Sequence, residues 1–107
     1  MFTFIELGGF SKRRAELLTD DEFKALQEAL IINPESGSRM VGTGGFRKLR
    51  WASSGKGKSG GVRVIYYNLT VSTGRLYLAL IYSKNEADNL TAAQKAQLKQ
   101  LSDVLKK

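Results

Sequence analysis

The sequence lacks several residue types that define common classes of protein. Its 107 residues include no cysteine, no histidine and only one proline. No disulfide bond can form, and the usual ligands of a zinc site are missing. No apolar run approaches the ~20 residues that cross a bilayer, and the start MFTFIELGG does not have the layout of a secretion signal. We therefore expect a cytoplasmic protein without a membrane segment, a metal site or a cofactor.

The middle of the chain also lacks acidic residues. Between Ser36 and Asn85 there is no Asp or Glu, whereas nine Lys and Arg residues stand there. The rest of the chain holds eight basic and ten acidic residues. A segment with one sign of charge attracts polyanions such as nucleic acid. It is also compatible with a solvated face that only keeps the protein in solution.

Length and composition predict a single globular domain. A chain of 107 residues supports one hydrophobic core, and 42% of its residues are hydrophobic. The sequence shows no internal repeat and no domain boundary. We therefore treat residues 1–107 as one domain.

The beginning of the chain predicts a strand and a short helix. The alternation in FTFIE predicts a strand over residues 2–6, with Phe2 and Phe4 facing one way. After the break at Gly8 and Gly9, Ser11 is placed to cap a helix that runs to about Leu18.

Two capping boxes predict two longer helices. In a capping box, the side chain of a threonine accepts from the amide of the residue three positions later, whose own side chain accepts from the threonine amide. The spacing fits Thr19 with Glu22 and Thr91 with Gln94. The first helix should end at Asn33–Pro34, because the residue before proline avoids the helical region. Each box precedes an apolar stripe at helical spacing: Phe23, Leu26 and Leu30, then Leu98, Leu101 and Leu105.

Three strands are predicted between these helices, from the segments FRKLRWA, VRVIYYNL and LYLALIYS. The alternation puts Lys48 and Arg50 on one face of the first, and Arg63 on one face of the second with Ile65. The turn at residues 72–74 joins the second strand to the third, and such short connections favour an antiparallel meander. The element order β, α, α, β, β, β, α predicts an α+β fold with a small antiparallel sheet, two N-terminal helices and one C-terminal helix.

The segment SSGKGKSGGVRVIYY contains Gly57-Lys58-Ser59, the end of a phosphate-binding loop motif. The glycine that the motif requires five positions earlier is Ala52. A phosphate-binding loop also leads from a strand into a helix, whereas this segment leads into a predicted strand. We therefore reject a nucleotide hydrolase. A hairpin tip with solubilising lysines remains possible for this loop.

The helix pair followed by GTGGFRKLRW, GKGKSGGVRVIYY and LIYSKNE resembles the RelE/HigB family of bacterial toxins, most closely its HigB-like branch. The resemblance covers almost the whole chain in element order and is most specific from Gly42 to Glu86. It implies a curved RelE/ParE-like sheet flanked by helices. It also implies a ribosome-dependent, metal-independent endoribonuclease that cleaves messenger RNA, inhibits translation and arrests growth. A cognate antitoxin, usually a helix-turn-helix protein, would neutralise the toxin and link it indirectly to operator DNA.

The resemblance implies roles for individual residues. The family's arginine of the middle strand falls on Arg63, a bidentate donor to the scissile phosphate. Its paired basic residues fall on Lys48 and Arg50, which would act as a base or a phosphate clamp. Lys84 and Tyr82 would orient the substrate or protonate the leaving 5′ oxygen. The same residues are open to structural roles, such as a surface ion pair, polar alternation on a strand or a core aromatic.

Further basic residues are predicted to bind RNA: Arg39, Arg47, Lys56 and Lys58. The loop from Ser53 to Gly61 is longer than in the shortest family members, so its two lysines either grip ribosomal RNA or take part in catalysis. The family's base-stacking tyrosine is absent from NEADNLT, and Tyr82 is a candidate to replace it by stacking.

Two other functions remain open. The related ParE proteins share the fold and inhibit DNA gyrase without cleaving RNA. A basic RNA-binding module without catalysis is the third alternative. It would bind with a steep salt dependence and lose little affinity when any one cation is removed, whereas catalysis predicts a loss of ~100-fold or more at Arg63.

Overall fold

Nine helices and strands are found in the part of the chain that the computed structural model describes, which is residues 2–53, 61–84, 86 and 89–107. They make an α+β fold with one five-stranded sheet, which confirms the predicted class. In chain order the elements are β1 (Thr3–Glu6), α1 (Phe10–Leu17), α2 (Asp20–Ile32), β2 (Ser38–Arg39), β3 (Arg47–Trp51), β4 (Val62–Leu69), α3 (Thr70–Thr73), β5 (Arg75–Ser83) and α4 (Ala92–Leu105).

The sheet has the strand order β1-β5-β4-β3-β2. The predicted meander is confirmed, since β3, β4 and β5 pair antiparallel in sequence order. The sheet as a whole is mixed, because β1 pairs parallel with β5. A short connection favours antiparallel pairing only between strands that are consecutive in sequence. Strands β1 and β5 are not consecutive, because α1, α2 and three other strands lie between them in the chain. The two-residue β2, which pairs antiparallel with β3, is an addition to the predicted elements.

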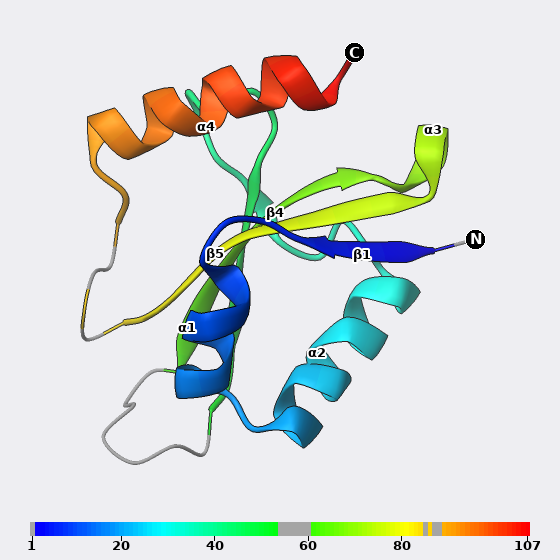
Figure 1. The fold of residues 1–107 in the computed structure, drawn as a ribbon, viewed down its shortest axis with the longest axis vertical. Coiled ribbons are helices and arrows are strands. Elements are labelled where there is room, and N and C mark those ends of the chain that lie inside the picture. The colour runs from blue at the N-terminus through cyan, green and yellow to red at the C-terminus, as the bar shows by residue number, and fades with distance from the viewer. Residues whose placement is uncertain (1, 54–60, 85, 87–88) are drawn as a thin grey trace.

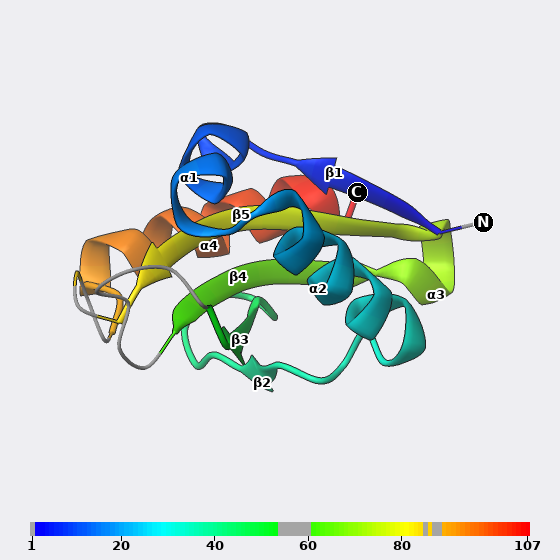
Figure 2. The ribbon, with the colours of Figure 1, turned by 90° about the horizontal axis from the view of Figure 1, so that it is seen from below.

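The helices cover the two faces of the sheet in three layers. Figure 2 shows α1 and α2 on the near face and α4 behind the sheet. In Figure 1 the same sheet is seen nearly edge-on, with α4 above it and α1 and α2 below it. None of the helices in the described ranges is long and apolar enough to cross a bilayer.

Both predicted capping boxes are confirmed. The Thr19 hydroxyl accepts from the Glu22 amide at 3.1 Å, and the Glu22 carboxylate accepts from the Thr19 amide at 2.8 Å. Thr91 and Gln94 make the same two bonds at 3.1 and 2.9 Å. Helix α2 ends with Asn33 as its C-cap, as predicted from the following proline.

Two local predictions are wrong. Helix α1 begins at Phe10 with Gly9 at its N-cap, two residues before the expected cap at Ser11. Ser11 lies inside the first turn, where its hydroxyl donates to the Glu6 carboxylate at 2.6 Å, and no side chain caps the helix. The connection between β4 and β5 is the one-turn helix α3 rather than a simple turn at residues 72–74. Leu69 is the N-cap of this helix, and the carboxamide oxygen of Asn68 just before it accepts from the Thr70 amide at 3.0 Å.

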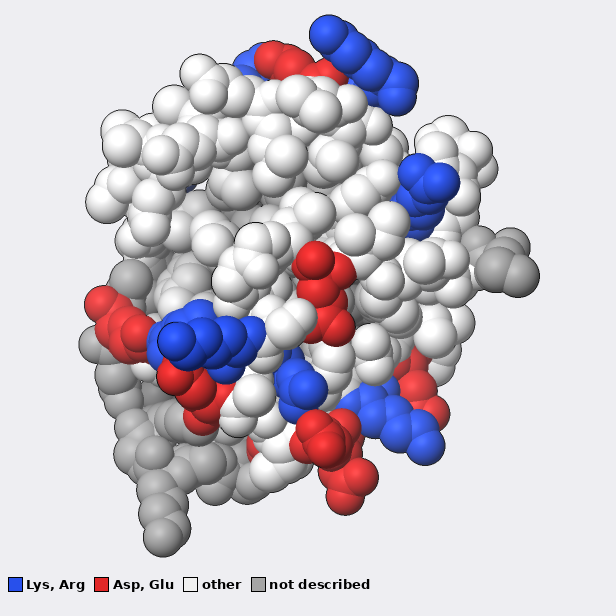
Figure 3. All heavy atoms as spheres, viewed as in Figure 1, with Lys and Arg blue, Asp and Glu red and all other residues white. Residues whose placement is uncertain are grey.

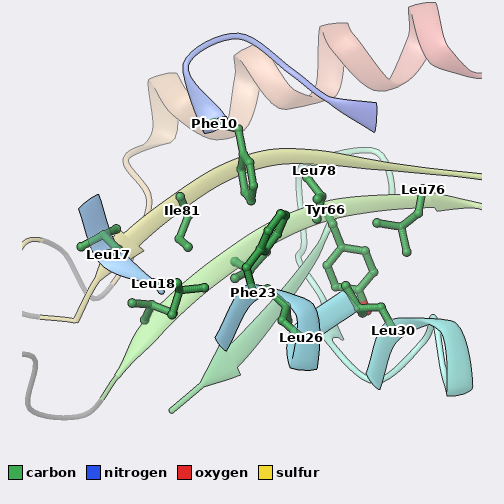
Figure 4. Packing of buried hydrophobic residues seen from close by; sticks show 12 residues of the cluster. Phe10, Leu17, Leu18, Phe23, Leu26, Leu30, Tyr66, Leu76, Leu78 and Ile81 are labelled. Atoms are coloured by element: carbon green, nitrogen blue, oxygen red, sulfur yellow. The ribbon is translucent and has the colours of Figure 1, made fainter. Parts of the chain in front are cut away.

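The core consists of two clusters, one on each face of the sheet. The first packs α1 and α2 against β4 and β5 and is drawn in Figure 4. The predicted stripe of α2 belongs to it, since Phe23, Leu26 and Leu30 are all buried. The second cluster packs α4 against the other face and includes Phe46 and Leu98. Each face of the sheet is therefore tied to its own helical layer.

Candidate active site

Strand pairing brings three of the predicted site residues into one row across the sheet. Arg50 on β3 is paired with Arg63 on β4, and Arg63 is paired with Tyr82 on β5. Neighbouring strands lie ~4.8 Å apart, so the row spans about 10 Å. Lys48 stands in the next row of the same face, opposite Ile65. Three strands therefore concentrate these four side chains in one small area.

This row lies on the face of the sheet that carries α4. Ile65 and Phe46 belong to the core cluster beneath α4, and side chains two positions away along each strand share their face. The predicted grouping of Lys48 and Arg50 on one face is thereby confirmed. Arg50 is exposed and Tyr82 is half-buried, whereas Arg63 is only 3% exposed.

An irregularity in β5 brings Tyr82 to this face. Ile65 is paired with Leu80 but the next residue, Tyr66, is paired with Leu78, so Ala79 is an extra residue on β5. Strict alternation would place Tyr77 and Tyr82 on opposite faces, and the bulge puts both in the cluster beneath α4. Such bulges often re-aim a side chain beside an active site. The segment LYLALIYS carries no local signal for this bulge.

The row places two like charges next to each other. Two like charges directly opposite each other destabilise an antiparallel strand pair, and Arg50 and Arg63 stand in this relation. The Arg63 guanidinium donates to the carbonyl of Val62 at 3.3 Å. A phosphate between the two guanidinium groups would offset their repulsion through charge-assisted hydrogen bonds.

Lys48 is held toward the segment that precedes α4. Its ammonium group donates to the side-chain oxygen of Asn89 at 3.5 Å. Asn89 immediately precedes Leu90, which is buried in the cluster beneath α4. Sequence reasoning missed Asn89, because a contact between positions 48 and 89 leaves no trace in the local pattern.

Lys84 follows β5 and is exposed. Its amide donates to the carbonyl of Gly61 at 3.3 Å, which ties it to the residue before β4. Nearby, the Glu86 carboxylate accepts from the Ser83 amide at 3.0 Å and forms an ion pair with Arg13 of α1. The Ser83 amide and the Arg13 guanidinium lower the pKa of Glu86 below its ordinary value. The acidic residue nearest to Lys84 in sequence is therefore engaged by α1.

Two of the predicted RNA-binding residues lie away from the row. Arg47 donates to the carbonyls of Gly37 and Glu35 at 2.7 and 3.3 Å, so its guanidinium braces the segment that leads into β2. Arg39, on β2 at the edge of the sheet, is exposed. The other two, Lys56 and Lys58, lie outside the described residues.

The face that carries α1 and α2 has mixed charge. Figure 3, which looks at the edge of the sheet as in Figure 1, shows acidic and basic side chains interspersed in its lower half, the side on which α1 and α2 lie. Two of the ion pairs there join Arg13 to Glu16 and Arg14 to Asp20, both at 2.7 Å. In the described ranges, no group of three or more acidic side chains converges to hold a metal ion. Charges of both signs therefore alternate on this side of the molecule.

No protein-family model matches the chain. The family resemblance stays a prediction that depends on the residues and the geometry given above.

Proposed function

We propose that the protein is a toxin of the RelE/HigB type that cleaves messenger RNA on the ribosome without a metal ion. The observation that carries this proposal is the row of Arg50, Arg63 and Tyr82, with Lys48 beside it on the same face. Two arginines at paired positions of neighbouring strands suit a phosphate, and a lysine and a phenol on the same face suit proton transfers.

The reaction that fits this set is attack by an RNA 2′ oxygen on the adjacent phosphorus. The O–P bond forms as the bond to the 5′ oxygen breaks, which leaves a 2′,3′-cyclic phosphate and a 5′ hydroxyl. Arg50 and Arg63 stabilise the charge that develops on the phosphorane, since guanidinium groups stay protonated in proteins and cannot serve as the base. Lys48 takes the proton from the 2′ hydroxyl as a neutral amine, since an ammonium group has no lone pair to accept it, and Tyr82 or Lys84 gives a proton to the 5′ oxygen.

The burial of Arg63 adds a requirement to this mechanism. A side chain that is 3% exposed cannot contact a phosphate until the groups around it move aside. Binding to the ribosome and to the message would supply the energy for this change. With the family resemblance, the proposal includes a cytoplasmic protein that contacts ribosomal RNA and messenger RNA and that a cognate helix-turn-helix antitoxin holds inactive.

The test is brief induction in growing cells, followed by mapping of new 5′ ends in messenger RNA. We expect the unaltered protein to arrest growth and to produce cleavages within translated frames. Arg63→Ala should remove both effects. Arg50→Ala tests the same row at an exposed position, where the fold is less at risk. Arg75→Ala is the matched control, because Arg75 is an exposed arginine at the far end of β5 from Tyr82. This variant should retain full activity.

The alternatives predict different results. Growth arrest with intact messages and broken or supercoiling-defective DNA would favour gyrase inhibition and overturn the proposal. Ribosome binding without arrest or cleavage would favour a non-catalytic RNA-binding module. Equal activity of the Arg50 and Arg75 variants would remove Arg50 from the site.

A further inference from the structure

A second group of cations lines two adjoining pockets near the end of α4. One pocket, of about 340 Å³, is lined by Arg39, Lys106 and residues 40–42, 44 and 45 of a glycine-rich segment. The other, of about 220 Å³, shares Arg39, Lys106, Gly44 and Gly45 with the first and reaches Tyr67 and Asn68. Arg39 and Lys106 are far apart in sequence, so the fold alone brings them to one place.

The charge in these pockets is mainly positive. Arg39, Arg47 and Lys106 stand against one carboxylate, that of Glu35, which lies 3.9 Å from the Arg47 guanidinium. Glu35 and Arg47 offset each other, which leaves Arg39 and Lys106 to act on a ligand. The carbonyls at the end of α4 oppose an anion with a partial charge of about −0.5, which is less than the two cations supply.

The absence of a side chain at Gly45 keeps the space open. A Cβ atom there would lie 3.6 Å from the Arg39 guanidinium and 3.2 Å from the Tyr67 ring. The Tyr67 hydroxyl donates to the carbonyl of Gly44 at 3.3 Å, and its ring packs on Phe46 with centroids 4.8 Å apart. Arg39, the Tyr67 ring and the bare backbone of Gly45 therefore line the same space.

We propose that Arg39 and Lys106 bind one phosphodiester group of an RNA backbone in this pocket, separate from the row at Arg63. Tyr67 lies four residues beyond Arg63 on β4, which puts the two places about 13 Å apart. The choice of RNA as the source of the phosphate rests on the proposed function. The pocket would hold the RNA in register, while the row acts on a different phosphate.

The test is binding of a 2′-O-methyl oligouridylate of about eight nucleotides, which cannot be cleaved through its 2′ oxygen. Affinity is measured across a salt series for the unaltered chain, Arg39→Gln, Lys106→Gln and the double variant. Each phosphate contact contributes about 0.7 to the slope of log affinity against log salt for a single strand. Because both cations hold the same phosphate, the double variant should lose about 0.7 in slope and not twice that amount. Its affinity should fall roughly tenfold.

The control variant is Lys24→Gln, which removes an exposed cation from α2 on the other side of the sheet. It should leave the slope unchanged. Amide NMR provides a local measurement, since the oligouridylate should shift the signals of Gly44 and Gly45 only while Arg39 and Lys106 are present.

Several outcomes would overturn the proposal. An unchanged slope in the double variant, or a loss equal to that of Lys24→Gln, would leave the two cations as solvated surface charges. A polyglutamate peptide that shifts the Gly44 and Gly45 signals where the oligouridylate does not would assign the pocket to an acidic protein segment. Failure of the cell experiment alone would refute cleavage and leave this binding site intact, because the oligouridylate assay involves no cleavage.

Discussion

The contact between Gly44 and α4 leads to a quantitative prediction for Gly44→Ala. Gly44 has φ of 76°, in the region that glycine occupies without strain and alanine avoids. A Cβ atom at this position would lie 1.9 Å from Ser102 Oγ and 2.8 Å from Ser102 Cβ. Ser102 is fully buried, and its hydroxyl donates to the carbonyl of Lys99 at 2.6 Å. Rotation of the hydroxyl relieves only the first contact, so α4 or the segment at Gly44 must shift.

The expected loss of stability has two parts. The left-handed conformation costs a residue with a Cβ about 1–2 kcal/mol. Overpacking of a buried contact adds about 1–3 kcal/mol. Gly44→Ala should therefore reduce the free energy of unfolding by about 2–5 kcal/mol. Gly42→Ala separates the two parts, because Gly42 has φ of 82° and a Cβ there would meet nothing within 4 Å. It should lose only the first amount.

The assay is urea unfolding followed by fluorescence of Trp51, the single tryptophan, which packs against the core cluster of α1 and α2. Circular dichroism provides a second probe of the same transition. A double variant with Ser102→Gly should recover the overpacking part. Losses that agree within about 0.5 kcal/mol for Gly44→Ala and Gly42→Ala would refute the steric argument, since conformation alone would then explain both.

Three further predictions concern polar contacts. Tyr66→Phe should cost about 1–3 kcal/mol in urea unfolding, because the buried hydroxyl donates to Pro34 and accepts from Gly37, both at 2.9 Å; an effect below about 0.5 kcal/mol would contradict this. Thr91→Ala should lower stability by about 1 kcal/mol through loss of the α4 cap, and Thr91→Ser should restore it. Glu86→Gln should cost well under ~1 kcal/mol at neutral pH, because the pair is half-exposed. Because the pKa of Glu86 is lowered in the folded protein, its contribution to stability is present above pH 4.5, the ordinary pKa of a glutamate, and is lost as the pH falls through the lower folded pKa. The stabilities of the unaltered protein and Glu86→Gln should therefore converge in acid.

Much of the fold is predictable because its signals are local. The capping boxes at Thr19 and Thr91 and the proline after Asn33 act within one helical turn, and the structure confirms each of them. The parallel pairing of β1 with β5 could not be predicted in this way, because it depends on packing between two segments that are far apart in the sequence. The predicted start of α1 is wrong for a related reason. The Ser11 side chain bonds to Glu6 of β1, a contact between two elements that the local helix pattern does not indicate.

The candidate site also combines features that local sequence predicts with features that depend on the assembled fold. Alternation along β3 predicts that Lys48 and Arg50 share a face, and the antiparallel register then aligns Arg50 with Arg63. The position of Tyr82 depends on the bulge at Ala79, which no local sequence pattern predicts. The burial of Arg63 and the meeting of Arg39 with Lys106 arise only when the whole sheet and α4 are assembled.

The parallel pairing of β1 with β5 has a consequence for how the chain folds during synthesis. Thr3 is paired with Arg75, 72 positions later, so β1 is made first but must wait for its partner strand. At synthesis rates of ~5–20 residues per second, the wait is roughly 4–14 s. During this time Phe2 and Phe4, whose ring centroids lie 4.9 Å apart in the finished protein, have no sheet to cover. The meander of β3, β4 and β5 has the shorter loops to close and should form first, and β1 should dock last at the edge of the sheet.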